Sequence, residues 1–376
     1  MKIAAIQAIP LAIPLKPLSP PSAWTGATRK QIVVRVTTDD GLTGTGEAFA
    51  YGAPLAVSSV IDESLAPLLI GQDPRRIDAL VDLMHRGTMI YGRRGLAMFA
   101  ISGVEIALWD LVGRSLGAPV WALLGGATRS RLPAYASLMR YDSPDDVAAA
   151  CRGFVAQGFR MLKLHQTDVA SVKAAREAVG TGVELMLDTN CPWDPAEAIA
   201  MARALQPYRL FWLEEPVWPP EDYAGLARVA ASTPTPIALG ENESTAFGFR
   251  EIIAHRAGGI LQPSITKVGG ISEFRKIAAL AQAANLPVVP HSFYFGPGLA
   301  ATLHVAATLG GSWPIEFPTG LLETPFLTRP IVARDGWVGL PEGPGLGVDV
   351  NDEAIRRHPY TSAGATPFVL TDRPQS

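Results

Sequence analysis

From residue 131 onward, short apolar runs alternate with longer segments of helical periodicity. Helical stretches such as DVAAACRGFVAQG and ISEFRKIAALAQAAN separate eight apolar runs: RLPAYAS, FRMLKLH, VELMLD, RLFWLEE, PIALGE, GILQPSI, PVVPHS and WPIEF. Strands that alternate with helices are typical of a parallel sheet, and a count of eight is that of a (β/α)8 barrel. The pattern therefore predicts an α/β fold whose larger part is such a barrel.

The first 125 residues follow a different pattern. MKIAAIQAIPLAIPL is interrupted by Gln7, Pro10 and Pro14, and it indicates a strand rather than a signal peptide. IVVRVTTDDGLTGTGEAF has β-branched residues on both sides of an Asp-Gly turn, which predicts a β-hairpin. Helical periodicity follows in VSSVIDESLAPLLIG, PRRIDALVDLMHR and AISGVEIALWDLVGRSL. We therefore predict an α+β domain at 1–125, the barrel at 126–320, and a tail at 321–376 that packs back on the first domain.

Composition narrows the classes of function. The chain of 376 residues is 48% hydrophobic, enough for a sizeable core. Its net charge is −3 and it has no basic run, so it carries no nucleic-acid signature. No uninterrupted apolar run reaches membrane-spanning length, and Cys151 and Cys191 cannot form a disulfide framework. We expect a cytoplasmic protein that binds neither nucleic acid nor membrane.

A carboxylate stands at the end of three successive apolar runs: Asp188 in ELMLDTN, Glu214 in LFWLEEP and Glu241 in PIALGEN. Successive members are 26 and 27 residues apart, the length of about one βα unit. Active sites of such barrels lie at the C-terminal ends of the strands, so these acids are expected to meet there. An all-oxygen cluster suits Mg2+. The alternative is that each acid only caps the following helix.

Other candidate residues also fall at strand ends. Lys163 and His165 in LKLH are two positions apart, so both side chains are expected to point into the barrel mouth. His291 ends the seventh apolar run and Glu316 lies in the eighth. The alternatives are that Lys163 forms a structural ion pair, that His165 is a core histidine and that Glu316 is an ordinary loop acid.

With these residues in view, the chain resembles the mandelate racemase and muconate lactonizing branch of the enolase superfamily. The resemblance rests on ordered motifs: AISGVEIALWDLVGRSLGAPVWALLG at 100–125, then LMLDTN, WLEEP, LGEN, TKVGG, PHSF and IEFP. It implies an N-terminal α+β capping domain on a modified TIM (β/α)8 barrel. It also implies a Mg2+ held by Asp188, Glu214 and Glu241, and abstraction of the proton α to a substrate carboxylate.

The resemblance implies roles for the remaining candidates, with two departures from the family pattern. Similar enzymes commonly carry Lys-x-Lys where this chain has Lys163 and His165, so either of these residues is a candidate base. Many place an Asp-His dyad where this chain has Ser264 and His291. A neutral serine should leave His291 with a lower pKa, as an acid or a hydrogen-bond donor. Glu316 matches an acid that, if protonated, donates a hydrogen bond to the substrate carboxylate.

Further residues are expected around this centre. Asn190 and Asn242 lie beside the metal acids and are candidates to orient them, and Glu215 is expected to face away from Glu214. Lys267 is a candidate base on the second face of the site, but it corresponds to a common lysine before the glycines, which favours a structural role. In similar enzymes two capping-domain loops contact the substrate, which here brings in four candidates: Trp24, Arg29, Lys30 and Tyr51.

The resemblance implies a Mg2+-dependent lyase or isomerase of carbohydrate acid metabolism with a small-molecule carboxylate substrate. We favour dehydration of a sugar acid or hydroxy acid through an ene-diolate. A racemase or epimerase, a lactone cycloisomerase, and a relic that binds sugar acids without turnover remain alternatives. Similar enzymes are symmetric homo-oligomers, often octamers.

Overall fold

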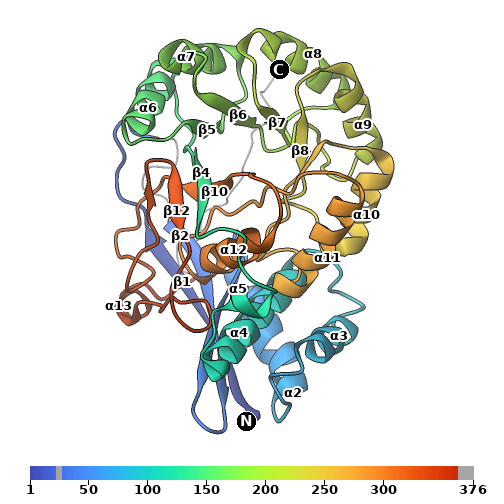
Figure 1. Ribbon diagram of the computed structural model, residues 1–376, viewed down its shortest axis with the longest axis vertical. Coiled ribbons are helices and arrows are strands. Elements are labelled where there is room, and N and C mark those ends of the chain that lie inside the picture. The colour runs from blue at the N-terminus through green and yellow to red at the C-terminus, as the bar shows by residue number, and fades with distance from the viewer. Residues whose placement is uncertain (23–27, 363–376) are drawn as a thin grey trace.

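The computed structural model describes residues 1–22 and 28–362. Figure 1 shows a barrel of strands ringed by helices, with an N-terminal unit against one end of it. That N-terminal unit has a three-stranded antiparallel sheet in the order β1 (Ile3–Pro14), β2 (Thr28–Thr38) and β3 (Thr43–Ala48). The pairing of Thr37 with Thr43 closes the β2–β3 hairpin at the Asp-Gly turn, as the sequence predicts.

Helices cover one face of this sheet. They are α1 (Pro54–Ser59), the π-helix η1 (Val60–Leu65), α2 (Ala66–Leu69), α3 (Ile77–Gly87), α4 (Leu96–Leu116) and α5 (Val120–Leu123). Strand β3 lies so close to α4 that a Cβ on Gly46 would clash with the Gly103 carbonyl. Close approach of strand and helix requires glycine here.

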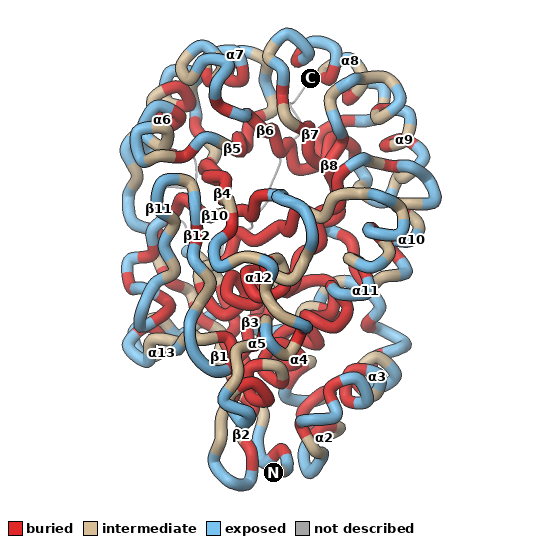
Figure 2. Tube along the Cα trace, viewed as in Figure 1, coloured by how far each residue is buried: buried red, intermediate tan, exposed pale blue. Residues whose placement is uncertain are grey.

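Helix α4 is the central helix of the N-terminal unit. In the described part of the chain it is the single helix whose length and apolar composition would suit a membrane span, but 83% of that window is buried inside the protein. Figure 2 shows the buried backbone concentrated in α4, in α12 and in the barrel strands. Helix α4 is therefore a core helix between the sheet and the barrel.

The barrel strands follow the predicted order. Parallel neighbours run from β4 through β9, and β10 returns to pair with β4. Their bounds are β4 (Arg131–Ser137), β5 (Met161–Leu164), β6 (Glu184–Asp188), β7 (Trp212–Glu214), β8 (Ile237–Leu239), β9 (Ile260–Leu261) and β10 (Ile315–Pro318).

One predicted strand needs correction. The run PVVPHS forms only isolated parallel bridges, from Leu261 to Val288 and from Ser264 to His291. Pro287 and Pro290 have no backbone N–H to donate, so a continuous ladder cannot form there. The segment still occupies the seventh position of the barrel and delivers His291 to its mouth.

Seven α-helices and one 3-10 turn connect these strands in the described residues and form the outer layer (Figures 1 and 2). They are α6 (Pro144–Ala156), α7 (Val169–Val179), α8 (Pro195–Leu205), η2 (Gln206–Tyr208), α9 (Tyr223–Ser232), α10 (Thr245–His255), α11 (Gly270–Ala283) and α12 (Pro297–Thr308). Several begin at side-chain caps, and Asp194 and Glu197 form a full capping box at α8.

The barrel interior is filled beneath the candidate site by one apolar cluster: Tyr135, Met186, Trp212, Ala238, Ile260 and Val289. Met186 lies two residues before Asp188, and Trp212 lies two residues before Glu214. Strand side chains alternate, so the residues that floor the site and the acids above them share the inward face. The alternation that builds the core also aims the carboxylates.

The C-terminal part contacts both units. The hairpin of β11 (Ala333–Arg334) and β12 (Trp337–Gly339) adds antiparallel to β4 of the barrel, which the sequence did not indicate. A bridge from Leu11 to Pro359 and the Arg35–Asp352 ion pair at 2.7 Å join the tail, including α13 (Asp352–Arg357), to the N-terminal sheet. The domain boundaries themselves stay a prediction.

Candidate active site

The three strand-end carboxylates meet at the barrel mouth. Asp188 ends β6, Glu214 ends β7 and Glu241 follows β8 by two residues. One carboxylate oxygen from each lies within 4.8 Å of the others, and all three residues are buried. The backbone N and Nδ2 of Asn190 donate to Asp188 Oδ1 at 3.0 and 2.9 Å, which fixes that carboxylate. A buried, converging, all-oxygen donor set fits Mg2+.

Lys163 on β5 is fully enclosed by carboxylates. Its Nζ lies 3.0 Å from Asp188 Oδ2, 2.9 Å from Glu214 Oε1 and 2.9 Å from Glu316 Oε1. Burial by itself lowers the pKa of Lys163, but the surrounding carboxylates outweigh it and hold that pKa well above the usual range. The lysine is therefore a fixed cation, in the position that the ion-pair alternative describes.

The ring of His165 is held between two acceptors. Its Nδ1 contacts the carbonyl oxygen of Leu138, which can only accept a hydrogen bond, so Nδ1 carries the proton. The other nitrogen, Nε2, lies 3.4 Å from Asp188 Oδ2. The Nε2 atom of His165 therefore faces the carboxylate cluster, as expected from its position two residues beyond Lys163.

His291 lies on the other side of the cluster. Its Nε2 is 3.3 Å from Glu241 Oε2, and its Nδ1 is 3.2 Å from Ser264 Oγ and 3.3 Å from the Tyr294 hydroxyl. Ser264 and Tyr294 are also hydrogen-bonded to each other. Burial lowers the pKa of His291 to about 4 although Glu241 and Glu316 oppose the shift, so this imidazole is neutral at pH 7.

Glu316 on β10 accepts hydrogen bonds at both oxygens. Ser137 Oγ donates to Oε1 at 2.7 Å, and the backbone N of Ser292 donates to Oε2 at 2.8 Å. Burial raises the pKa of Glu316, but Lys163 and His291 outweigh it and bring that pKa down to about 2. These contacts favour the ionised form, so they do not support the expectation that a protonated Glu316 donates to the substrate.

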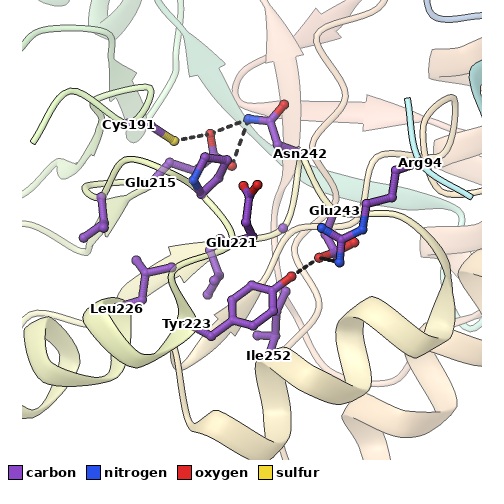
Figure 3. Close-up of a pocket in the computed structure, with 13 residues that line it drawn as sticks. Arg94, Cys191, Glu215, Glu221, Tyr223, Leu226, Asn242, Glu243 and Ile252 are labelled. Atoms are coloured by element: carbon purple, nitrogen blue, oxygen red, sulfur yellow. Dashed lines mark hydrogen bonds and ion pairs between the residues drawn. The ribbon is translucent and has the colours of Figure 1, made fainter. Parts of the chain in front are cut away.

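The remaining candidates divide around the metal acids. Lys267 Nζ lies 3.2 Å from Glu241 Oε1, so it neutralises one member of the triad. Asn242 does not touch the triad, and its Nδ2 donates to Glu215 at 2.9 and 3.1 Å. Figure 3 shows Glu215 between Cys191 and Asn242 at one end of a small pocket behind the site. Glu215 thus lies outside the triad, as the alternation of strand residues predicts.

Residues of the N-terminal unit reach the barrel mouth. The Tyr51 ring contacts the guanidinium of Arg29, whose Cζ lies 4.5 Å from the ring centroid. Lys30, the next residue of β2, instead lies near the Tyr360 ring, 5.8 Å from its centroid. Trp24 lies outside the described residues.

Two site residues escaped the sequence analysis. Tyr294 completes the hydroxyl pair on His291, and Ser137 orients Glu316. Tyr294 lies three residues after His291 in HSFYF, and Ser137 ends the first strand of the barrel. The strand-end position of Ser137 was an available signal, because barrel active sites gather residues from all strand ends.

Comparison with known proteins finds matches along most of the chain. The family model for the N-terminal domain of mandelate racemase and muconate lactonizing enzymes matches residues 7–125, and the enolase C-terminal domain-like model matches residues 146–354. An arabinonate dehydratase of Saccharolobus solfataricus is 35% identical over 338 residues, covering 87% of this chain and 90% of the relative. A D-galactarolactone cycloisomerase of Agrobacterium fabrum is 34% identical over 346 residues, with the coverage again 87% and 90%.

Solved structures of the same family are similar over nearly the whole chain. A racemase of Streptomyces coelicolor, solved with bound magnesium, superposes with a TM-score of 0.86 at 32% identity and covers 95% of this chain and 100% of its own. The relatives are dehydratases, which are lyases, and cycloisomerases and racemases, which are isomerases. The chain is thus an enzyme that belongs to the mandelate racemase and muconate lactonizing enzyme family of the enolase superfamily.

Proposed function

We propose that this enzyme is a Mg2+-dependent sugar acid dehydratase in which His165 removes the proton α to the substrate carboxylate. The observation that carries the proposal is the pair of contacts on His165. Its Nδ1 is committed to the Leu138 carbonyl, and its Nε2 faces the carboxylate cluster 3.4 Å from Asp188. An imidazole nitrogen held in this position beside the substrate site is suited to act as a general base near neutral pH.

Lys163 is a poor candidate for the base. Each of its three close contacts is a carboxylate, and all of them favour the ammonium form. Its charge instead balances Asp188, Glu214 and Glu316 and keeps their oxygens in place. We therefore propose His165 rather than Lys163 as the base.

Asp188, Glu214 and Glu241 would hold the metal, since their oxygens converge within 4.8 Å. When bound there, Mg2+ supplies positive charge for the negative charge that develops on the ene-diolate. Lys267, at 3.2 Å from Glu241, contributes a further fixed positive charge from the protein.

Dehydration requires two proton transfers, one from the α-carbon and one to the departing hydroxyl. His165 takes the α-proton as the C–H bond breaks, and the neighbouring hydroxyl then leaves as water once it receives a proton. His291 is neutral at pH 7 because burial lowers its pKa to about 4, so it holds no excess proton to give. We therefore assign both transfers to His165, which places departure of the hydroxyl on the same face of the substrate as proton removal. The resulting enol becomes a 2-keto-3-deoxy acid.

Lactone cycloisomerization is the second candidate. The similarity to the D-galactarolactone cycloisomerase at 34% identity favours it, since the similarity to the arabinonate dehydratase is hardly greater. Both reactions would begin with the same proton abstraction and differ in which oxygen leaves. A racemase or epimerase would need His291 to reprotonate the opposite face. The relic that binds without turnover is the weakest alternative, because Lys163, His165 and all three acids are in place.

The test is product identification. Purified enzyme with Mg2+ is incubated with a panel of aldonates, aldarates and their lactones, and products are read by carbon NMR. A 2-keto-3-deoxy acid identifies the dehydratase, whereas a rearranged lactone or an open-chain isomer without loss of water identifies the cycloisomerase. We also propose a cytoplasmic location. We propose a homo-oligomeric, octameric assembly, which light scattering tests.

A further inference from the structure

An arc of side chains runs over the barrel mouth from the metal acids to His165. Lys267, next to Glu241, lies 4.4 Å from the centroid of Phe49, and Phe49 lies 4.5 Å from Tyr51 between ring centroids. The far side of the arc is made by Arg29, whose Cζ is 4.4 Å from the Phe293 centroid, and by Phe293, whose ring is 6.4 Å from that of His165.

A single aromatic side chain, that of Phe293, therefore lies between Arg29 and the candidate base His165. Phe293 connects the two, because its ring lies against the guanidinium on one side and meets the imidazole of His165 edge to face. Arg29 enters from β2 of the N-terminal unit, so it faces the barrel mouth from the side opposite the strand ends. A sugar acid with its carboxylate at the metal acids and its α-carbon at His165 would extend its remaining carbons toward this arginine.

Most N–H groups of the Arg29 guanidinium are available to donate hydrogen bonds to a ligand. A guanidinium carries five N–H groups, and in the described part of the chain Arg29 donates one hydrogen bond, from Nη2 to the Phe293 carbonyl at 2.9 Å. No described carboxylate lies at ion-pair distance from it. Glu47 is nearby, but its oxygens accept from Gln31 Nε2 at 3.1 Å and from the Gly298 backbone at 2.8 Å.

The surroundings of Arg29 favour an anion as its ligand. The rings of Tyr51, Phe293 and Phe295 lie within 5.7 Å of Cζ and shield part of the guanidinium from water. Burial lowers the pKa of Arg29 to about 9, against the opposing effects of Tyr294 and Glu47. A charge that has lost water without gaining a carboxylate is stabilised when a bound anion supplies one.

We propose that Arg29 binds a second carboxylate of the substrate, which makes the enzyme selective for dicarboxylic sugar acids over their monocarboxylic counterparts. A guanidinium donates two parallel hydrogen bonds to a carboxylate, whereas a terminal alcohol gives it one weak acceptor. This inference rests on the proposed function, because it needs the first carboxylate at the metal acids.

The test compares an aldonate with the aldarate that differs only at the terminal carbon, such as galactonate and galactarate, choosing the pair that the enzyme turns over fastest. Wild type is expected to prefer the diacid in kcat/KM. In Arg29→Met, which keeps an unbranched side chain between the rings, that preference is expected to fall roughly tenfold to a hundredfold. Lys173→Met removes an exposed cation on an outer helix of the barrel and should leave the preference unchanged.

Binding separates this proposal from the proposed function. Calorimetry with the same two acids and Mg2+ in the His165→Asn background should show the same loss of diacid preference when Arg29→Met is added. If Arg29→Met slows or weakens both acids equally, Arg29 only holds the two units together and the proposal is wrong. If no acid is turned over, the dehydratase proposal fails, and the calorimetric preference still decides the role of Arg29.

Discussion

Lys163 and Asp188 form a buried ion pair directly beneath the candidate metal site, with Nζ 3.0 Å from Oδ2 and each side chain 1% exposed. The same Oδ2 atom lies 3.4 Å from His165 Nε2. One carboxylate oxygen therefore borders both a permanent cation and the candidate base. This arrangement separates the two residues of the LKLH segment by role: the lysine fixes the charge of the acids, and the histidine is left to move a proton.

Replacing Lys163 by methionine should destabilise the protein strongly. The substitution leaves Asp188, Glu214 and Glu316 buried without their shared cation, and loss of one partner from a buried pair costs about 3–5 kcal/mol. Urea denaturation measures the change in the free energy of unfolding. The matched control is Lys173→Met, because Lys173 is 57% exposed and its ion pair with Glu177 spans 3.9 Å. Equal effects of the two variants would show that Lys163 does not stabilise the cluster.

Replacing His165 by asparagine should remove the base with little change to the site. The Asn amide can still donate to the Leu138 carbonyl, as Nδ1 does now, but it has no basic nitrogen. We expect kcat to fall by roughly 10^2 to 10^4, with substrate affinity nearly unchanged. Steady-state kinetics and calorimetry check the two quantities separately. A variant that retains more than a tenth of wild-type kcat would move the role of base to another residue.

Magnesium should stabilise the fold through the three acids. At a hundredfold excess over the dissociation constant, a ligand that binds only the folded state adds about 2.7 kcal/mol. Thermal unfolding with and without Mg2+ should show this gain in wild type. In a separate activity assay, EDTA should remove the activity. Glu241→Gln should abolish the gain, whereas Glu215→Gln should keep it, since Glu215 is buried nearby but lies outside the triad. The reverse order of these two variants would relocate the metal.

His304, which lies outside the active site, should make the free energy of unfolding depend on pH. Its Nδ1 accepts from the Trp121 backbone at 3.2 Å and its Nε2 donates to the Leu346 carbonyl at 3.0 Å, so the ring is held neutral. Burial lowers its pKa from 6.5 to about 4. The unfolded chain therefore binds this proton first, and the contribution of His304 is complete above pH 6.5 and is lost as the pH falls toward 4.

That loss should reach roughly 3 kcal/mol, because each pKa unit corresponds to about 1.4 kcal/mol. His291 titrates in the same window, so the measurement is the difference between wild type and His304→Gln in unfolding free energy across this pH range. The variant should be less stable at pH 7 and should approach wild type at low pH. Parallel profiles would mean that His304 does not cause the pH dependence.

The convergence of the three acids could be predicted from the sequence for a local reason. A βα repeat places a strand end every 26 or 27 residues, and alternation along each strand decides which acid faces inward, so Glu214 could be distinguished from Glu215. The side chain two residues after Lys163 could be placed in the same way. These inferences need only chain-local periodicity.

Contacts between distant segments could not be inferred in this way. The hydrogen bond from Arg29 to Phe293 joins residues 264 positions apart, and Glu105 of α4 caps the N-terminus of α11 from 167 positions away at Ser272. The protonation of Glu316 was open for the same reason, since it depends on Ser137, Lys163 and His291, which come from three other barrel positions. The seventh strand is irregular where the apolar pattern predicts a regular one, because two prolines in one short run interrupt its ladder.

Abstraction of the α-proton of a carboxylate substrate is the role proposed for His165. The most direct test is proton NMR in D2O, with Mg2+ and the best acid from the panel, on wild type and on His165→Asn. Wild type is expected to replace the α-proton by deuterium or to turn the acid over, and His165→Asn is expected to do neither while it still binds the acid. Exchange at the wild-type rate in His165→Asn, or no exchange in wild type with any bound acid, would contradict this role.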